Sequence, residues 1–325
     1  MKKNVLRITA FLAFGFLFVG CNEDFLETTP LSEVAEGNVW SDKKLAEAAV
    51  LDLYQGTWAG TLTREETTDA FTDQAVFTHP GRGVDGYTEG KMNPAGNFMD
   101  MQWFSWPQLY PFIRSANNAI AKLTANEAGM EAALVNRLLG EAHFMRGYFY
   151  TQLMRQFGGV VLTLEPLTLD SESNNPRATF AETVNQILSD LDKAIDLLED
   201  APIDPARAHK ITALAMKSRV LTHVASDLYE PSKNSGVSTI ASYSNPELIG
   251  WTSGSQLQRW EAAKAASKAL LDATTGYKLD YTAPASQEEA IQNYEDIWLQ
   301  GDQNQDFIWG RLVEEFGFGS RTYPG

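Results

Sequence analysis

The 325-residue chain has few of the residues on which several common kinds of site depend. Cysteine occurs once, at Cys21, which excludes an internal disulfide framework and a thiolate metal cluster. Basic residues are also few, because 26 Lys and Arg against 42 Asp and Glu give a formal net charge of −16. Such a chain repels a phosphate backbone, so nucleic acid is not expected as a partner. After residue 20 no apolar run approaches the roughly 18 residues of a membrane-spanning helix.

The first twenty residues have the pattern of a secretory signal. Lys2, Lys3 and Arg7 form a basic start, and residues 8–20 are almost entirely apolar. This run is too short to span a hydrocarbon core of about 30 Å, but it suits the apolar segment of a signal peptide. We therefore expect residues 1–20 to be removed from the mature protein.

Cys21 follows this segment directly, and the run Leu17-Phe18-Val19-Gly20-Cys21 resembles a bacterial lipobox. Cleavage before Cys21 leaves the only thiol at the mature N-terminus. Two or three acyl chains there, at roughly 0.8 kcal/mol per buried CH2, hold a protein durably on a membrane. The alternative is an ordinary secreted protein with a cysteine near its cleavage site by chance. Residues 21–40 are expected to form a tether, whose acidic start resembles a surface-export signal or simply keeps the tether soluble.

Residues 41–325 are expected to form one all-α domain with long irregular loops. The chain is 44% hydrophobic, which is enough for a large core. Apolar residues recur at spacings of three and four, and strand-like alternation is never sustained. Ser41 is expected to cap the first helix, and Thr179 with Glu182 forms a capping box. The expected helices cover about 41–58, 106–120, 131–157, 179–198, 209–229, 260–273 and 286–298.

Two of these helices resemble each other at an offset of 71 residues. Ala142, Met145, Gly147 and Phe149 correspond to Ala213, Met216, Ser218 and Val220. The offset is close to two units of a 34-residue tetratricopeptide repeat. The sequence therefore predicts a superhelix of stacked helical hairpins, an architecture whose concave face and loops bind other molecules.

The stretches 140–150 (GEAHFMRGYFY) and 155–160 (RQFGGV) are similar to the core signature of the SusD/RagB family. Further segments match in the family's order, from the mature N-terminus at Cys21 to residues 260–279. Independently of this resemblance, Ala142 and Gly147 allow close helix packing. Gly158-Gly159 can end the helix with positive φ, and the arginines can pair with carboxylates of neighbouring turns. Two departures, Val161 and Asp227, concern only loop geometry.

The resemblance implies a non-catalytic, lipid-anchored outer-membrane protein that binds oligosaccharides. It also implies a partner, a SusC-like TonB-dependent transporter that receives the glycan. Members of the family are longer than this chain, whose last residues, 317–325, read as a loop. We therefore expect a fragment that lacks the C-terminal part of the family domain.

No motif predicts a cofactor, a metal or a catalytic centre. Residues 81–86 fit G-x-G-x-x-G but lack a preceding strand and a following helix. Residues 302–306 begin like a calcium loop, but Phe307 replaces its glycine, which leaves only an irregular oxygen site open. The histidines form no i, i+4 pair, and His143 is expected to be a packed residue. A glycoside hydrolase remains an alternative, because among 42 carboxylates some pair always has a suitable separation.

A sugar site needs flat aromatic side chains with amide and carboxylate partners. Most tryptophans lie on helix stripes and are expected in the core, so the candidates come from the loops near 60–103 and 230–256. The proposed ligand contacts are Trp103, Tyr87, Trp251, Asp73 and Asn97. The same aromatics could instead anchor their loops or contact the transporter. An alternative function is a surface helical-repeat module that binds peptide or protein cargo.

Overall fold

The computed structural model describes residues 39–58, 72–74, 76, 89, 106–168, 175–201, 204, 206–274, 283–299 and 307–310. No β-strand occurs in this part of the chain, and the fold is all-α, as the sequence predicts. The long helices are α3 (Lys43–Asp52), α5 (Trp106–Ala125), α6 (Ala132–Phe157), α7 (Phe180–Leu197), α8 (Lys210–Val224), α10 (Gln256–Ala273) and α11 (Gln287–Leu299). The short elements are η3 (Leu53–Trp58), η6 (Asp227–Tyr229), α9 (Ser238–Ala241) and η7 (Pro246–Leu248).

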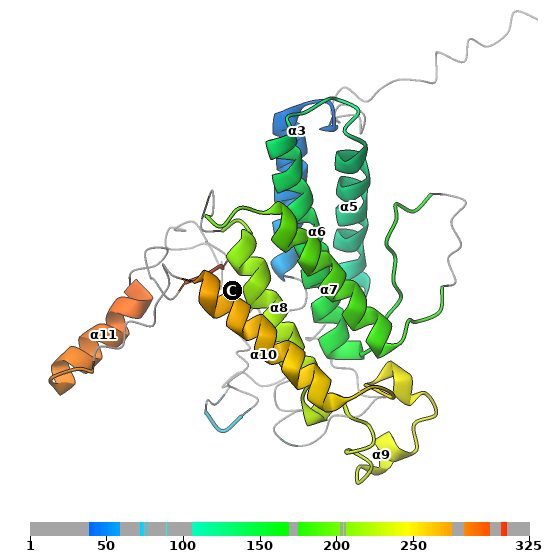
Figure 1. Cartoon of the computed structure of the whole chain (residues 1–325), viewed down its shortest axis with the longest axis vertical. Helices are drawn as coiled ribbons and strands as arrows, with labels where there is room; N and C mark the ends of the chain where they lie inside the picture. The colour runs from blue at the N-terminus through cyan, green and yellow to red at the C-terminus, as the bar shows by residue number, and fades with distance from the viewer. Residues whose placement is uncertain are drawn as a thin grey trace, which may run out of the picture.

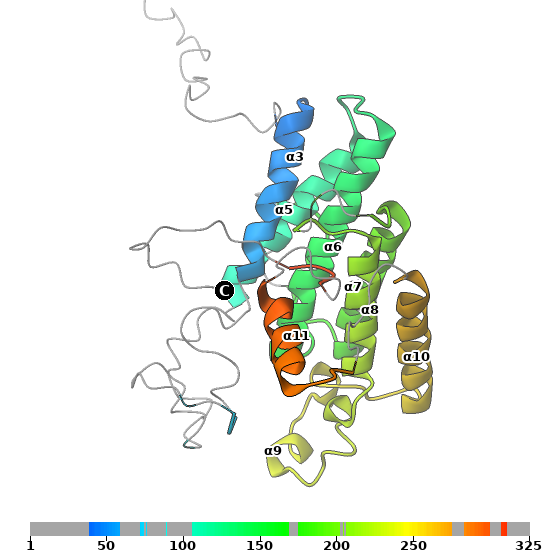
Figure 2. The ribbon, with the colours of Figure 1, turned by 90° about the vertical axis from the view of Figure 1, so that its left-hand side faces the viewer.

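The helices stack as successive antiparallel hairpins. Helix α6 packs against α5 and α7, and α8 packs against α7 and α10. Figure 2 shows the order along the stack, from α3 at one end to α10 at the other. Helix α11 projects to one side of this stack (Figure 1).

The internal repeat of the sequence corresponds to two equivalent hairpins, α6–α7 and α8–α10. The offset of 71 residues therefore spans one hairpin of long helices, not the two 34-residue units that the sequence predicts. Gly147 of α6 faces α7, because a Cβ built there would lie 3.3 Å from the Cβ of Asp190. Its counterpart 71 residues later, Ser218 of α8, faces α10 through a 2.8 Å hydrogen bond between its hydroxyl and that of Ser267. In both hairpins a small residue therefore lets the second helix approach the first.

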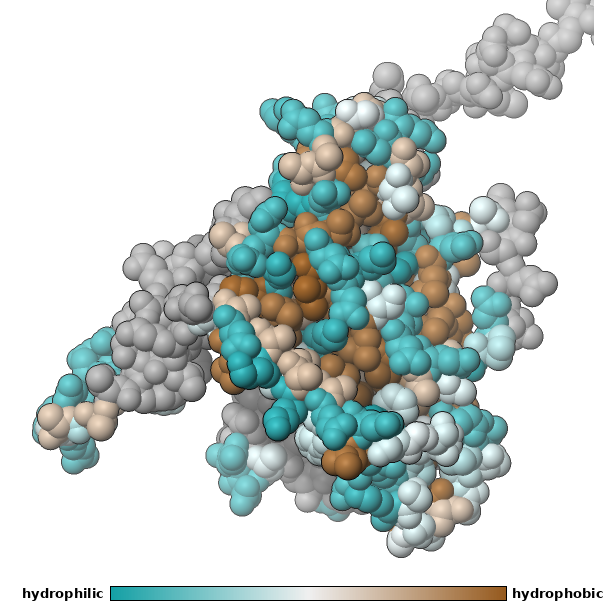
Figure 3. Space-filling view, viewed as in Figure 1, coloured by the Kyte–Doolittle hydropathy of each residue, from teal (hydrophilic) through white to brown (hydrophobic). Residues whose placement is uncertain are grey.

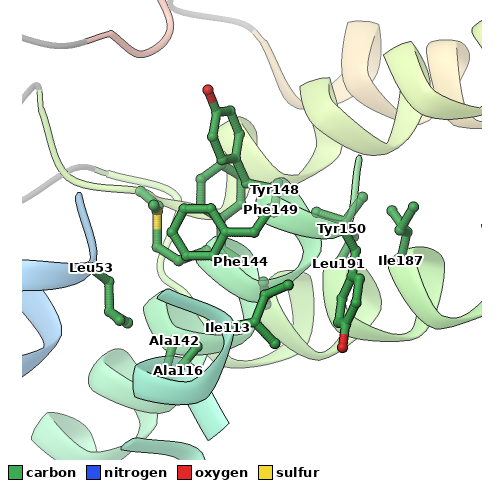
Figure 4. Close-up of a cluster of buried hydrophobic side chains, with 14 of the residues drawn as sticks. Leu53, Ile113, Ala116, Ala142, Phe144, Tyr148, Phe149, Tyr150, Ile187 and Leu191 are labelled. Carbon is green, nitrogen blue, oxygen red and sulfur yellow. The ribbon is translucent and has the colours of Figure 1, made fainter. Parts of the chain in front are cut away.

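The core follows α6, which is buried on most sides over residues 138–154. Figure 4 shows Phe144 and Phe149 of this helix beside Leu53, Ile113 and Ala116 of neighbouring elements. It also shows Tyr148 and Tyr150 pointing to opposite sides of α6. In the space-filling view, apolar residues form a band across the middle of one face, bordered by hydrophilic residues (Figure 3).

Several boundaries differ from the sequence prediction for local reasons. The N-cap of α3 is Asp42, not Ser41, because the Asp42 carboxylate accepts hydrogen bonds from the backbone N–H groups of residues 44 and 45. Helix α8 ends at Val224, and the chain continues into η6. Helix α10 begins four residues before Trp260, after the cap at Ser255. Trp260, expected in the core, is 44% exposed.

Other local predictions agree with the structure. Thr179 and Glu182 form the reciprocal capping box at the start of α7. Gly158 follows α6 with φ 73° and accounts for the end of that helix.

Candidate functional site

The signature stretch 140–150 lies within α6 and places two charged residues in the interior. The side chains of Glu141 and Arg146 are only 1% and 7% exposed. A buried charge is stable only where hydrogen-bonded partners of opposite charge replace water. Residues of neighbouring helices, and of the segment before α8, provide those partners.

Arg146 joins three elements of the stack. Its Nε and Nη2 atoms donate to the two carboxylate oxygens of Asp190 on α7, at 2.9 and 2.6 Å. Its Nη1 donates to the side-chain oxygen of Asn117 on α5, at 2.8 Å. His143 completes this cluster through its Nδ1, 2.8 Å from Asp190. These four side chains hold α5, α6 and α7 together.

The charge of Asp190 depends on these partners. Burial alone raises the pKa of the Asp190 carboxyl, but the hydrogen bonds and charges of His143 and Arg146 outweigh burial and lower that pKa. The carboxylate is therefore ionised at neutral pH and committed to the ion pair.

Glu141 makes a second buried cluster on another side of α6. Arg207 donates to both of its carboxylate oxygens, at 2.7 and 2.9 Å. The hydroxyl of Tyr54 donates to Glu141 at 2.8 Å and accepts from the backbone N–H of Ala208 at 2.9 Å. Burial, and then the charge of Glu141, raise the pKa of Tyr54. The cluster therefore ties η3 to α6 and to the segment before α8.

The glycine pair of the signature lies close to the backbone of two neighbouring segments. A Cβ added at Gly158 would lie 2.1 Å from the carbonyl oxygen of Leu248, and one at Gly159 would lie 2.1 Å from that of Ala178. Arg177 covers the end of the helix, since its guanidinium donates to the carbonyl oxygens of Phe157 and Gly159 at 2.5 and 2.7 Å. The signature thus sets how the chain leaves α6.

A hollow of about 470 Å³ lies between α6 and α8. It falls within the roughly 300–1,000 Å³ typical of small-molecule sites. Its polar lining includes Gln152 and Arg155 of α6, with Arg219 and His223 of α8. Trp309, from the described segment 307–310, also lines it and packs edge-on against Tyr148, with ring centroids 5.9 Å apart. We call this hollow the α6–α8 groove.

This groove could not be predicted from the sequence. No acidic residue lies three or four positions from either Arg155 or Arg219, but the same is true of Arg114, Arg146 and Arg259, so this spacing does not distinguish the groove arginines.

Of the five proposed ligand contacts, Trp103, Tyr87 and Asn97 lie outside the described residues. Asp73 is exposed in the short segment 72–74. Trp251 is partly buried. Cys21 and the motifs at 81–86 and 302–306 also lie outside the described residues.

Trp251 is held by the protein on several sides. Its indole N–H donates to the carbonyl oxygen of Val224 at 2.7 Å. Its ring packs edge-on against Phe180, and the guanidinium of Arg259 lies 4.7 Å from its centroid. These contacts anchor the 230–256 segment to α7 and α8.

In the described part of the chain, no group of three or more His, Cys, Asp or Glu side chains could hold a metal ion. The described helices likewise include none with the length and apolar character needed to cross a membrane.

A family model described as "Starch-binding associating with outer membrane" matches residues 24–221. The SusD-like protein P38 of Formosa agariphila is 27% identical over 250 residues, which cover 74% of this chain and 47% of that protein. A SusD-like protein of Bacteroides ovatus is 24% identical over 226 residues, which cover 68% and 39%. The chain therefore spans less than half the length of these relatives.

Solved structures share the fold. A SusD-like protein of Bacteroides fragilis superposes with a TM-score of 0.59 at 22% identity, over 88% of this chain and 47% of that one. A structure with xylogluco-oligosaccharide gives a TM-score of 0.52 at 17% identity, over 72% and 41%. Because the family model matches more than half of the residues and the signature in α6 builds the centre of the fold, this chain belongs to the SusD-like family.

Proposed function

We propose that the protein is a cell-surface lipoprotein that captures oligosaccharides and delivers them to a SusC-like TonB-dependent transporter of the outer membrane. The observation that carries this proposal is the family match over residues 24–221, whose description names starch binding and the outer membrane. A solved structure with xylogluco-oligosaccharide, which shares the fold, supports the same kind of ligand.

The proposed role is binding without catalysis. Glu141 and Asp190, the buried carboxylates of the central hairpin, are each held by an arginine at two points. Groups committed in this way stabilise helix packing and are poorly placed to exchange protons with a substrate. A glycosidase would need a free carboxyl pair flanking its substrate.

For the ligand contacts we retain the loop residues Trp103, Tyr87, Asp73 and Asn97. Flat aromatic rings suit the apolar face of a sugar, and the amide and carboxylate suit its hydroxyls. The hydrogen bond and ring contact of Trp251 indicate instead that this residue anchors its loop to the helices.

The binding part of the proposal is tested by titrating the purified full chain with starch and xyloglucan oligosaccharides. We expect saturable binding that weakens about tenfold, or about 1.4 kcal/mol, in Trp103→Ala. Trp260→Ala is the matched control, because Trp260 is an exposed tryptophan on α10. Binding of peptides but of no glycan would refute the proposal. Release of reducing ends from a polysaccharide would show that the protein is a glycoside hydrolase.

The anchoring part concerns the proposed division into a signal (1–20), a tether (21–40) and a body (41–325). We expect cells that produce the chain to attach radiolabelled palmitate to it, and Cys21→Ser to lose the label and leave the membrane fraction. Thr28→Ala, outside the lipobox, should keep both. Retention of label in Cys21→Ser would refute lipidation at this position.

A further inference from the structure

The α6–α8 groove has an unusual charge for this acidic chain. Arg155 and Arg219 line it from opposite helices, and both are exposed. Arg155 donates to the side-chain oxygen of Gln152 at 3.3 Å. Among the ion pairs between described residues, none includes Arg155 or Arg219. Neither guanidinium group is therefore committed to a carboxylate of the described residues, and both side chains are exposed.

Both arginines face the same histidine. Burial lowers the pKa of His223, and the positive charges of Arg155 and Arg219 lower it further. The His223 Nε2 atom lies 2.8 Å from the hydroxyl of Tyr229, which fixes the ring at the wall of the groove. The imidazole is thus neutral at pH 7, and the positive charge of the groove comes from the two arginines.

An aromatic wall lies beside these charges. Trp309 packs edge-on against Tyr148 and also against Phe144, with centroids 5.2 Å apart in the second pair. Its indole N–H donates to the carbonyl oxygen of Ala206 at 2.9 Å, so the ring is held in place. An aromatic surface next to guanidinium groups matches a sugar ring that has an apolar C–H face and an anionic substituent.

The neighbouring hollow makes a useful contrast. Trp309 and Gly310 also line a second hollow of about 350 Å³, whose other walls come from α3, η3 and Ala206. Asp52 carries the only formal charge among the described residues that line it. An anion is repelled there and attracted on the other side of Trp309.

We infer that the α6–α8 groove binds a sugar residue that carries an anionic group, either a carboxylate or a sulfate ester. Arg155 and Arg219 hold the anion as charged hydrogen-bond donors, and Trp309 with Tyr148 contacts the ring. This inference rests on the proposed function, because it takes the ligand to be a glycan.

The test is to titrate the full chain with oligogalacturonate, with a sulfated galactan oligosaccharide and with neutral starch oligosaccharides. We expect the variant Arg155→Gln/Arg219→Gln to lose at least about tenfold in affinity for one acidic ligand and to keep its affinity for the neutral one. The ligand that loses affinity identifies the anion. The control Arg114→Gln/Lys193→Gln removes the same charge from exposed positions of α5 and α7 and should keep all affinities.

Three results would overturn the inference. The inference fails if acidic affinity survives in the groove variant, falls equally in the control, or is undetectable in a chain that binds neutral glycans. The last result leaves the proposed function standing. A chain that binds no glycan overturns both. If the double variant fails to fold, Arg219→Gln alone decides, since this exposed side chain takes part in no hydrogen bond or ion pair with the described residues.

Discussion

Arg146 of α6 and Asp190 of α7 form a two-point ion pair, with donor–acceptor distances of 2.9 and 2.6 Å, in the interior of the central hairpin. The pair accounts for the arginine of the signature. That arginine fixes the approach of α7 to α6, and through Asn117 it also fixes the approach of α5.

Asp190→Asn should lower the free energy of unfolding by about 3–5 kcal/mol, because it leaves Arg146 as an uncompensated buried charge. Urea unfolding followed by circular dichroism measures the change. Asp192→Asn is the matched control two residues along the same helix. Its carboxylate pairs with Lys217 near the surface, so a loss of about 0–1 kcal/mol is expected. Equal losses in the two variants would show that the buried pair does not hold the hairpin.

Gly159→Ala should destabilise the protein by about 3 kcal/mol, at the upper end of the cost of overpacking. The added methyl group would lie 2.1 Å from the carbonyl oxygen of Ala178, and backbone cannot move aside as a side chain can. Gly236→Ala is the control, since a Cβ there has no atom within 4 Å. Thermal unfolding compares the two. An unchanged midpoint in Gly159→Ala would contradict the close approach.

Tyr54→Phe should cost about 1–3 kcal/mol, because it removes the hydroxyl that pairs with Glu141 and leaves the buried N–H of Ala208 without its acceptor. The control is Tyr243→Phe, at a position 39% exposed, for which a change below about 0.5 kcal/mol is expected. Denaturant unfolding measures both. If Tyr54→Phe is as stable as the unchanged chain, the second cluster does not contribute to stability.

Stability should fall as the pH drops below about 6.5, the ordinary pKa of histidine. Burial lowers the pKa of His209 and of His223, and the two groove arginines lower that of His223 further. The unfolded chain therefore binds protons at a higher pH than the folded one, so unfolding is favoured between the ordinary pKa and the lowered folded values. Urea unfolding at pH 7.5 and 5.5 should show this loss. The variant His209→Gln/His223→Gln should lose less between these pH values, and an equal loss would contradict the assignment.

Trp251→Phe should reduce stability by about 1 kcal/mol through loss of the hydrogen bond to Val224, while glycan affinity stays unchanged. Trp260→Phe, on the exposed side of α10, should change neither quantity. The two readouts are unfolding by urea and titration with starch oligosaccharides. A loss of glycan affinity without a loss of stability would show that Trp251 contacts the ligand.

Much of the scaffold could be predicted from local pattern. The box at Thr179 and the apolar stripes specify helices within a few residues, because hydrogen bonding and burial at these positions depend on near neighbours. The repeat between Gly147 and Ser218 also indicated hairpins, because a small residue is needed wherever two helices approach closely.

The partners of the charged side chains could not be predicted. Glu141 and Arg207 are 66 residues apart in the chain, and Arg146 and Asp190 are 44 apart, so only the tertiary fold brings each pair together. Likewise, Trp260 has the spacing of a core residue but lies on a side of α10 that faces outward. Helical spacing identifies a stripe, but the neighbours that cover it come from elsewhere.

The position of α7 predicts the order in which the helices unfold. This helix packs against both α6 and α8, whereas α10 packs chiefly against α8 at one end of the series. Amide protons of α10 should therefore exchange with solvent through local opening at a lower free energy than those of α6. Opening of α7 removes a packing partner from both α6 and α8, so the α6–α7 hairpin and its internal ion pair between Arg146 and Asp190 should open last.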